Sequence, residues 1–78
     1  MAQYTATRPV AVALDGPYAE QSRYSGDEYP EWAVCLADSD GEPVGKIYRC
    51  RSYDAARRLA ANMARDRRLP LEDESSPA

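Results

Sequence analysis

The chain has 78 residues, two cysteines and no histidine, which excludes a disulfide-rich scaffold and any site built on histidine. A domain of this length buries only about 60% of the surface that its unfolded chain exposes, so its core must be small. The net charge of −3 is unevenly distributed: residues 1–45 carry two arginines against eight acids, residues 46–68 eight bases against two acids, and residues 69–78 three acids. Charge segregated in this way favours particular partners and orientations.

The sequence contains no apolar run near the roughly 20 residues that span a bilayer, and its start, MAQYTATRP, lacks the features of a signal peptide. We therefore expect a cytoplasmic protein that does not enter a membrane. Cys35 and Cys50 are expected to be reduced thiols that pack as small apolar residues. Nothing in the sequence requires a cofactor or a metal.

Residues 9–14 predict the first strand, because Val10, Val12 and Leu14 alternate with smaller residues. The turn sequence Asp15-Gly16-Pro17 is expected to end it. We place this strand beside the hairpin formed by the residues that follow, since a two-stranded ribbon alone is only marginally stable.

Residues 18–30 have no hydrophobic period and predict a long loop. Its large residues are tyrosines, which either cover the edge of a thin core with their hydroxyls in water or form a contact surface. These candidate binding residues are Tyr18, Tyr24 and Tyr29.

Residues 31–38 and 44–51 predict a β-hairpin around the turn sequence Asp40-Gly41. A two-residue turn would place Trp32 opposite Arg49 and Val34 opposite Ile47. An odd-length loop, or a bulge at Gly45, would instead place Trp32 opposite Cys50 and Val34 opposite Tyr48. We favour the second register, because it gathers more apolar surface on the tryptophan face and leaves Arg49 and Arg51 outside.

A helix follows almost without a loop and should begin at a cap, either Ser52 or Asp54. Pro70 forbids its continuation, so we expect it to end near Arg68. Its apolar stripe has the i, i+3, i+4, i+7 spacing and consists of Ala56, Leu59, Ala60 and Met63. This stripe should pack against the hairpin face formed by Trp32, Val34, Leu36, Tyr48 and Cys50.

These elements together predict an α+β fold, in which a small three-stranded antiparallel sheet packs on one C-terminal α-helix in the order β-β-β-α. Residues 1–71 would form a single domain, and the polar residues 72–78 a disordered acidic tail. Residues 69–71 either fold back against the sheet or form a short edge strand.

The sequence shows no catalytic constellation. The carboxylate pairs Asp27-Glu28 and Asp38 with Asp40 lie in a predicted loop and a predicted turn, and in a turn aspartate commonly bonds the backbone. Two cysteines without histidine give neither a nucleophile–base pair nor a complete zinc site. We therefore predict that the protein is not an enzyme.

The strongest functional signal is a set of arginines on the last predicted strand and on the helix: Arg49, Arg51, Arg57, Arg58, Arg65 and Arg68. Such guanidinium groups either bind phosphates or form exposed ion pairs with nearby acids, each worth under about 1 kcal/mol. The acidic total counts against simple nucleic-acid binding, for which domains are usually basic.

The order strand, strand, DG turn, strand, helix, with Trp32 opening a strand and SYDAARRLAANMA opening the helix, resembles the DNA-binding modules of the Apetala and integrase arm-binding type. This resemblance covers about residues 31–71 and implies a sheet that enters the major groove, with roles for Arg49 and Arg51. The chain also resembles small uncharacterised proteins from proteobacterial genomic islands and plasmids, in which a helix ending in MARDRRL is followed by a short polar tail.

Our leading hypothesis is a non-enzymatic protein–protein interaction module that acts through the exposed side of the sheet and the tyrosine loop. A homodimer is one form that it could take, because the acidic half of one copy complements the basic half of another. The alternative is a nucleic-acid-binding module that uses the arginine-rich strand and helix. A further alternative is an acidic inhibitor, or nucleic-acid mimic, from a mobile element.

Overall fold

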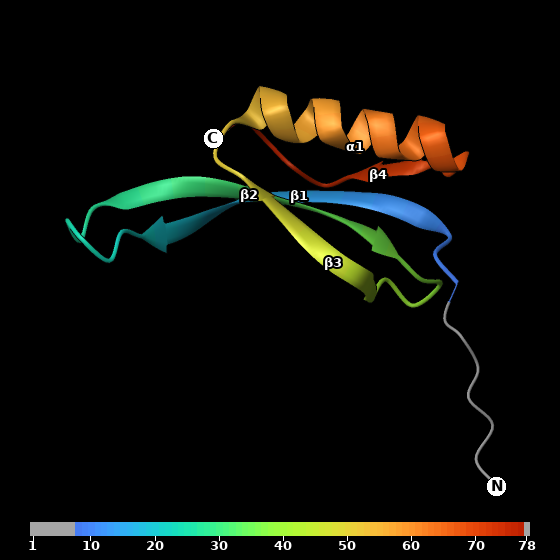
Figure 1. Ribbon diagram of the computed structural model, residues 1–78, viewed down its shortest axis with the longest axis horizontal. Helices are drawn as coiled ribbons and strands as arrows, with labels where there is room; N and C mark the ends of the chain where they lie inside the picture. The colour runs from blue at the N-terminus through green and yellow to red at the C-terminus, as the bar shows by residue number, and fades with distance from the viewer. Residues whose placement is uncertain (1–7, 78) are drawn as a thin grey trace, which may run out of the picture.

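The computed structural model describes residues 8–77, which form four strands and one helix (Figure 1). In chain order these are β1 (Ala11–Gln21), β2 (Glu28–Ala37), β3 (Pro43–Cys50), α1 (Tyr53–Arg67) and β4 (Leu71–Asp73). The expected β-β-β-α order is present, and a fourth strand follows it. Residues 1–7 of the expected domain and Ala78 of the expected tail lie outside the described residues.

The strands form one mixed sheet in the order β3-β2-β1-β4. β1 and β3 each pair antiparallel with β2, whereas β4 pairs parallel with β1. The prediction of a three-stranded, purely antiparallel sheet is therefore wrong by one strand. Because β3 and β4 run in the same direction, their connection has to cross the sheet, and α1 makes this crossing in contact with β1 and β2.

β1 and β2 form a hairpin much longer than the sequence predicts. Their pairing extends from Ala11 opposite Ala37 to Gln21 opposite Glu28. The Asp15-Gly16-Pro17 segment does not end β1, because the register shifts there and the strand continues beyond the irregularity.

The prediction of a loop over residues 18–30 is consequently wrong. Tyr18 lies in β1, Tyr29 lies in β2, and only residues 22–27 connect the two strands. These strand ends project beyond the helix, so neither of their faces is buried against it. They therefore lack the alternation of apolar and polar residues from which a strand is predicted.

β2 and β3 pair in the register that the sequence analysis favoured. Trp32 lies opposite Cys50 and Val34 opposite Tyr48. The register then shifts between Val34 and Leu36 on β2, at a point where Gly45 on β3 has a φ of 81°. Glycine adopts such a positive φ at little cost, so the predicted bulge at Gly45 is confirmed.

α1 begins and ends close to the predicted residues. Of the two candidate caps, Ser52 is the one used: the Ala55 N–H donates to its Oγ at 3.2 Å. At the other end Arg68 has a left-handed φ of 55°, and its N–H donates to the Arg65 carbonyl at 3.3 Å. Pro70 follows, as expected for a chain that cannot continue the helix.

The segment after α1 runs along β1, so the prediction of a disordered tail is wrong for its described residues, up to Pro77. Beyond β4, the Glu74 N–H donates to the Leu14 carbonyl at 2.9 Å and the Ser76 N–H to the Gly16 carbonyl at 3.1 Å. The indole N–H of Trp32 also donates to the Ser76 carbonyl, at 2.9 Å. Backbone pairing therefore orders a segment whose composition alone suggests disorder.

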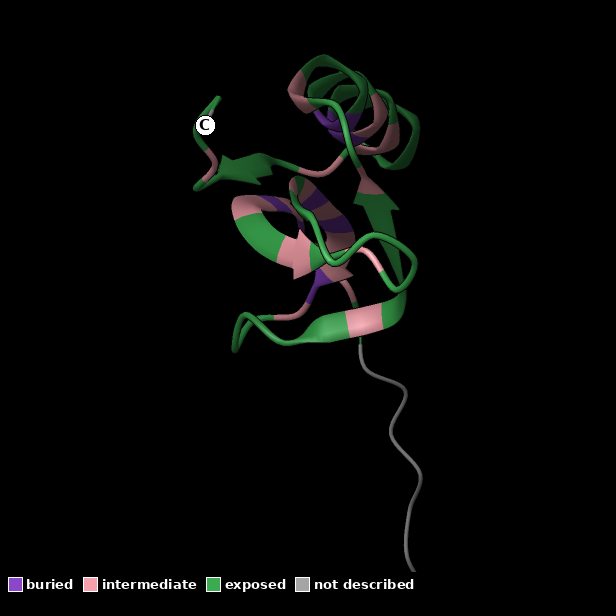
Figure 2. Ribbon diagram, turned by 90° about the vertical axis from the view of Figure 1, so that its left-hand side faces the viewer, coloured by how far each residue is buried: buried purple, intermediate pink, exposed green. Residues whose placement is uncertain are grey.

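One small core lies between α1 and the sheet, and Figure 2 shows the buried segments of the strands and the helix facing each other. Tyr48 is the exception to the predicted packing, because it is 38% exposed and its ring lies 4.9 Å from the Lys46 ammonium. The buried members of the core are Val12, Leu14, Trp32, Val34, Ala56 and Ala60, and Leu36, Cys50, Leu59 and Met63 are among the partly buried side chains that pack around them.

Candidate interaction surface

In the described chain, one face of the sheet has no second layer of structure over it. α1 covers the side that carries Val12, Leu14 and Val34, and the segment that contains β4 extends the sheet beside β1 (Figure 1). We call the opposite side the outer face. Its residues include Ala13, Asp15 and Tyr18 from β1, Ala33 and Cys35 from β2, and Ile47 and Arg49 from β3.

A groove of about 290 Å³ lies on the outer face. Ala13, Ala33 and Cys35 line its floor, and the 39% exposed Ile47 stands on its β3 side. The β1 and β4 side is acidic, with Asp15, Glu72 and Glu74. Because the floor side chains are small, an apolar group from a partner can approach the sheet closely here.

The acidic side of the groove has a fixed geometry. Asp15 Oδ1 accepts a hydrogen bond from the Gly16 N–H at 2.8 Å, and Asp15 Oδ2 accepts one from the Tyr18 hydroxyl. That hydrogen bond, partial burial and the negative charges of Asp15 and Glu74 raise the pKa of Tyr18. Among residues 8–77 the ion pairs are Arg49 with Glu31 and Arg65 with Asp66, so Asp15 and Glu74 have no cationic partner in that part of the chain.

At the far end of the outer face, strand arginines and tyrosines come together. Arg49 Nη1 lies 3.2 Å from Glu31 Oε1, and the Arg51 guanidinium lies 3.8 Å from the centroid of the Tyr29 ring. A second hollow, of about 480 Å³, brings together four of the predicted binding residues: Arg49, Arg51, Tyr24 and Tyr29.

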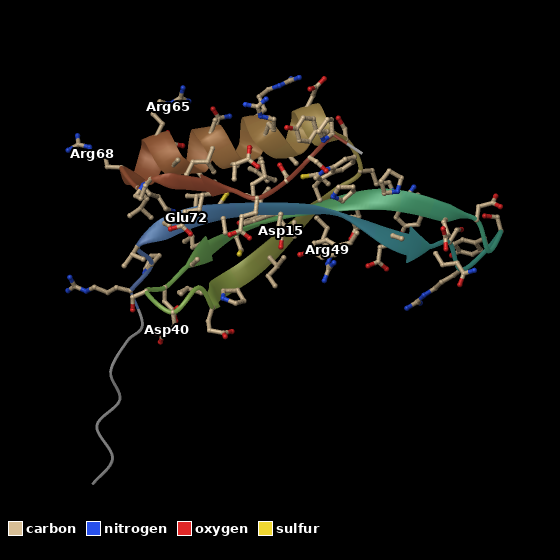
Figure 3. The ribbon with its side chains drawn as sticks, turned by 180° about the vertical axis from the view of Figure 1, so that it is seen from behind. Asp15, Asp40, Arg49, Arg65, Arg68 and Glu72 are labelled. Carbon is tan, nitrogen blue, oxygen red and sulfur yellow. The ribbon has the colours of Figure 1, made fainter. Side chains whose placement is uncertain are left out.

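The helix arginines do not belong to this surface. Figure 3 shows Arg65 and Arg68 on the helix side of the molecule and Arg49 on the opposite side of the sheet. Arg65 donates to Asn62 Oδ1 at 2.9 Å, as an exposed helix residue commonly does. The predicted arginine set is therefore divided into Arg49 and Arg51 on the sheet side and Arg57, Arg58, Arg65 and Arg68 on the helix.

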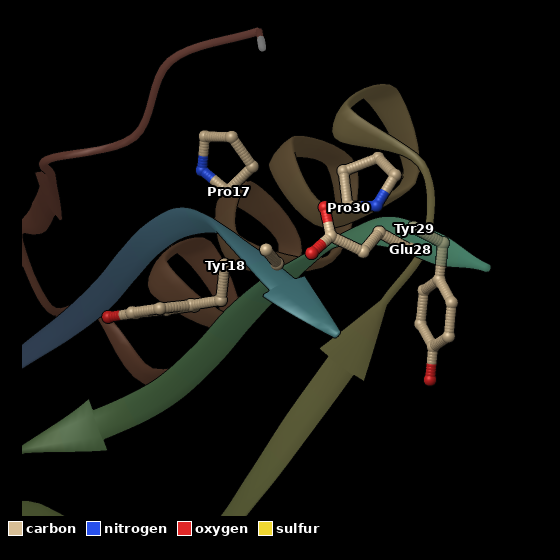
Figure 4. Close-up of a pocket in the computed structure, with 6 residues that line it drawn as sticks. Pro17, Tyr18, Glu28, Tyr29 and Pro30 are labelled. Carbon is tan, nitrogen blue, oxygen red and sulfur yellow. The ribbon is translucent and has the colours of Figure 1, made fainter. Parts of the chain in front are cut away.

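A third hollow, of about 330 Å³, lies where the β1–β2 hairpin projects beyond α1 (Figures 1 and 4). Pro17 and Pro30 line it from neighbouring strands, and the ring of Tyr29 points away from both prolines (Figure 4). Its lining is mostly apolar, with Glu28 as the charged member, so it offers contact area and no reactive group.

The two cysteines are free and lie on opposite sides of the sheet, Cys35 on the outer face and Cys50 against the core. Burial raises the pKa of both thiols. Within the described chain, no three His, Cys, Asp or Glu side chains lie close enough to hold a metal ion. No helix among residues 8–77 is long and apolar enough to cross a membrane.

Neither Ile47 nor the acidic side of the groove was predicted to belong to the site. Asp15 has the sequence context of a turn residue, and Glu74 that of a disordered tail, so only the strand pairing shows that they share a face. For Ile47 the sequence does hold an indication, because it is a large apolar residue on the same strand face as Arg49 and Arg51.

Comparison of the chain with protein-family models, with curated proteins and with solved structures gives no match.

Proposed function

We propose that this protein is a non-enzymatic protein–protein interaction module, and that it binds through the outer face of its sheet. The observation that carries this proposal is the uncovered face itself. It combines a groove with a small-residue floor, the exposed Ile47 and a charged rim. An apolar centre surrounded by polar groups is the usual arrangement of a protein interface.

The charges on the rim support a partner of defined orientation. Acids stand on the β1 and β4 side of the groove, and Arg49, which lines the neighbouring hollow, stands on β3 with 56% of its side chain exposed. A partner that places a cation over the acids and an anion over the arginine would associate faster and bind in one orientation. Tyr18 and Tyr29 add contact area with little rotamer entropy to lose.

The test compares two substitutions on neighbouring residues of β3. Ile47→Asp places a charge on the outer face, whereas Tyr48→Asp places the same charge on the other side of the sheet at nearly equal exposure, 39% against 38%. Each variant and the wild type are immobilised, and proteins captured from a bacterial lysate are quantified by mass spectrometry.

We expect specific partners to be captured by wild type and Tyr48→Asp and lost from Ile47→Asp. Undisturbed capture by Ile47→Asp would contradict the proposal. Circular dichroism of all three proteins establishes that a loss of binding is not a loss of folding.

A second candidate function, nucleic-acid binding, is favoured by one observation, the stacking of Arg51 on Tyr29 beside Arg49 and the fully exposed Tyr24. Aromatic rings interleaved with guanidinium groups are typical of platforms for single-stranded nucleic acid. Glu20 and Glu31 line the same hollow, however, and their charge would repel phosphates.

Fluorescence anisotropy of labelled oligonucleotides, single-stranded and double-stranded, at low salt tests this candidate. If it holds, the double variant Arg49→Ala/Arg51→Ala binds at least about tenfold more weakly, whereas Arg65→Ala/Arg68→Ala on the helix has a smaller effect. Affinity for double-stranded DNA should also fall with log salt by about 0.9 per phosphate neutralised. Equal losses in both double variants would show that the strand arginines form no dedicated site.

A further inference from the structure

The pairing of the strands places complementary groups in the same rows across the outer face. Asp15 on β1 lies opposite Ala33 on β2, which lies opposite Arg49 on β3. In the next row Ala13 lies opposite Cys35, and Ile47 lines the same groove from β3. The first row therefore has β2 at its centre with unlike charges on either side, and Ile47 stands on the β3 side of Cys35, where the β2–β3 register shifts.

With this arrangement, the outer face of one copy is complementary to the outer face of a second copy. A two-fold axis parallel to β2, above its outer face, would place β3 of one copy over β1 of the other. Arg49 of each copy would then lie over Asp15 of its mate, and Ile47 over Ala13. Stacked sheets commonly keep their strands within about 30° of each other, which this arrangement allows.

We propose that a second copy of this chain is the occupant of the outer face, in a two-fold dimer with β3 of each copy packed over β1 of its mate. This inference rests on the proposed interaction function and names one of its partners. Arg49, which lies 3.2 Å from Glu31 Oε1 in its own chain, would also face the mate's Asp15 and Glu74 carboxylates, which have no cationic partner among residues 8–77. Ile47, exposed in the single copy, is covered by the alanine of the mate.

The size of the face sets the expected strength of the dimer. Three strands about 4.8 Å apart, each covering some 6 residues of about 3.3 Å, give a contact of roughly 200 to 300 Å² in plan. This is small beside the roughly 800 Å² per partner of a stable interface, so the dimer should form only at high protein concentration. It should also weaken with salt, because its charged pairs are at the solvent-exposed rim.

Sedimentation velocity over a wide protein concentration range, at about 50 mM and about 500 mM salt, provides the first test. We expect concentration-dependent dimerisation that is at least about tenfold weaker at high salt. Ile47→Asp should abolish it and Tyr48→Asp, which alters the other side of the sheet, should not.

Charge exchange tests the two-fold pairing itself. Arg49→Glu and Glu74→Arg should each weaken self-association, and the double variant should restore most of it, because the pair is re-formed with the charges reversed. Glu74 is preferred to Asp15 here, since the Asp15 carboxylate accepts hydrogen bonds within its own chain. Arg58→Glu on the helix is the matched control for Arg49→Glu and should leave the dimer intact.

Cys35 lies near the axis and would face Cys35 of the mate. Both thiols would point into the gap of about 10 Å between the stacked sheets, so a short bifunctional maleimide should yield cross-linked dimers of wild type and Cys50→Ser but not of Cys35→Ser. A chain that stays monomeric at low salt and high concentration would overturn the dimer. If Ile47→Asp still lost a partner of another sequence in that case, the interaction function would stand without it.

Discussion

At the scale of single residues, Gly16 explains how β1 continues through a turn sequence. Its φ of +126° lies in the region that favours glycine, and a Cβ built there would lie 3.0 Å from both the Glu31 carbonyl oxygen and Trp32 Cδ1. Without a side chain, Gly16 lies close against buried Trp32, and its carbonyl accepts a hydrogen bond from the Ser76 N–H. One glycine thus joins the irregularity in β1 to the core and to the C-terminal segment.

We predict that Gly16→Ala destabilises the fold by more than about 2 kcal/mol, because it adds a steric clash to backbone strain. Gly41→Ala is the matched control: its φ is +81°, but a Cβ added at Gly41 would meet no atom within 4 Å. That control should cost only about 1 kcal/mol. Urea denaturation followed by Trp32 fluorescence measures both, and equal midpoints for the two variants would contradict the role assigned to Gly16.

The sequence predicts the structure well where residue type limits the backbone strongly. Ser52 at the helix start, Pro70 beyond its end and Gly45 in the bulge each have few alternatives, so their structure was predictable. The residue types of Asp15-Gly16-Pro17 do not decide its structure, because both a turn and an irregularity within a strand use these residues. The contact between Gly16 and Trp32 decides between the two, and no local pattern reveals it.

At the scale of elements, β4 and the residues after it show the limit of composition as a guide. Leu71-Glu72-Asp73 has no apolar alternation, and all three residues are exposed. Their order comes from the unpaired edge of β1, which offers backbone partners whatever the side chains are. The acidic side of the candidate surface was unpredictable for this reason, since Glu72 and Glu74 reach the groove only through that pairing.

A truncated chain ending at Pro70 should therefore be much less stable than the full chain, although it loses mostly polar residues. It gives up the pairing of β4 with β1 and the hydrogen bond from the Trp32 indole to Ser76. We expect a lower urea midpoint and a red-shifted Trp32 emission. Removal of residues 77–78 alone is the control, and a truncation at Pro70 with unchanged stability and emission would contradict this assignment.

At the scale of the whole molecule, the fold is a thin two-layer structure with extents of 50 × 31 × 17 Å. Among the described residues, the fully buried large side chains are few: Leu14, Val12 and Val34. Two alanines, Ala56 and Ala60, form the buried part of the helix and bring it close to the sheet. Stability should consequently depend heavily on each large core residue.

We predict that Leu14→Ala lowers the free energy of unfolding by about 2–5 kcal/mol, a large part of the total for a domain of this size. Val10→Ala provides the control, because Val10 is 44% exposed at the start of the same alternation. It should cost less than about 1 kcal/mol. Comparable urea midpoints for the two variants would show that the core is not where we place it.

The directions of the strands have a consequence for how copies could add to one another at their edges. β3 and β4 are the two outermost strands and run the same way, so β3 of one copy could pair parallel with β4 of the next, in a head-to-tail arrangement. Such a contact does not close and would propagate into a fibre. The glycine bulge in β3 and the shortness of β4 oppose it. A substitution of Gly45 that straightens β3 would thus remove one of the features that oppose edge-to-edge association of copies.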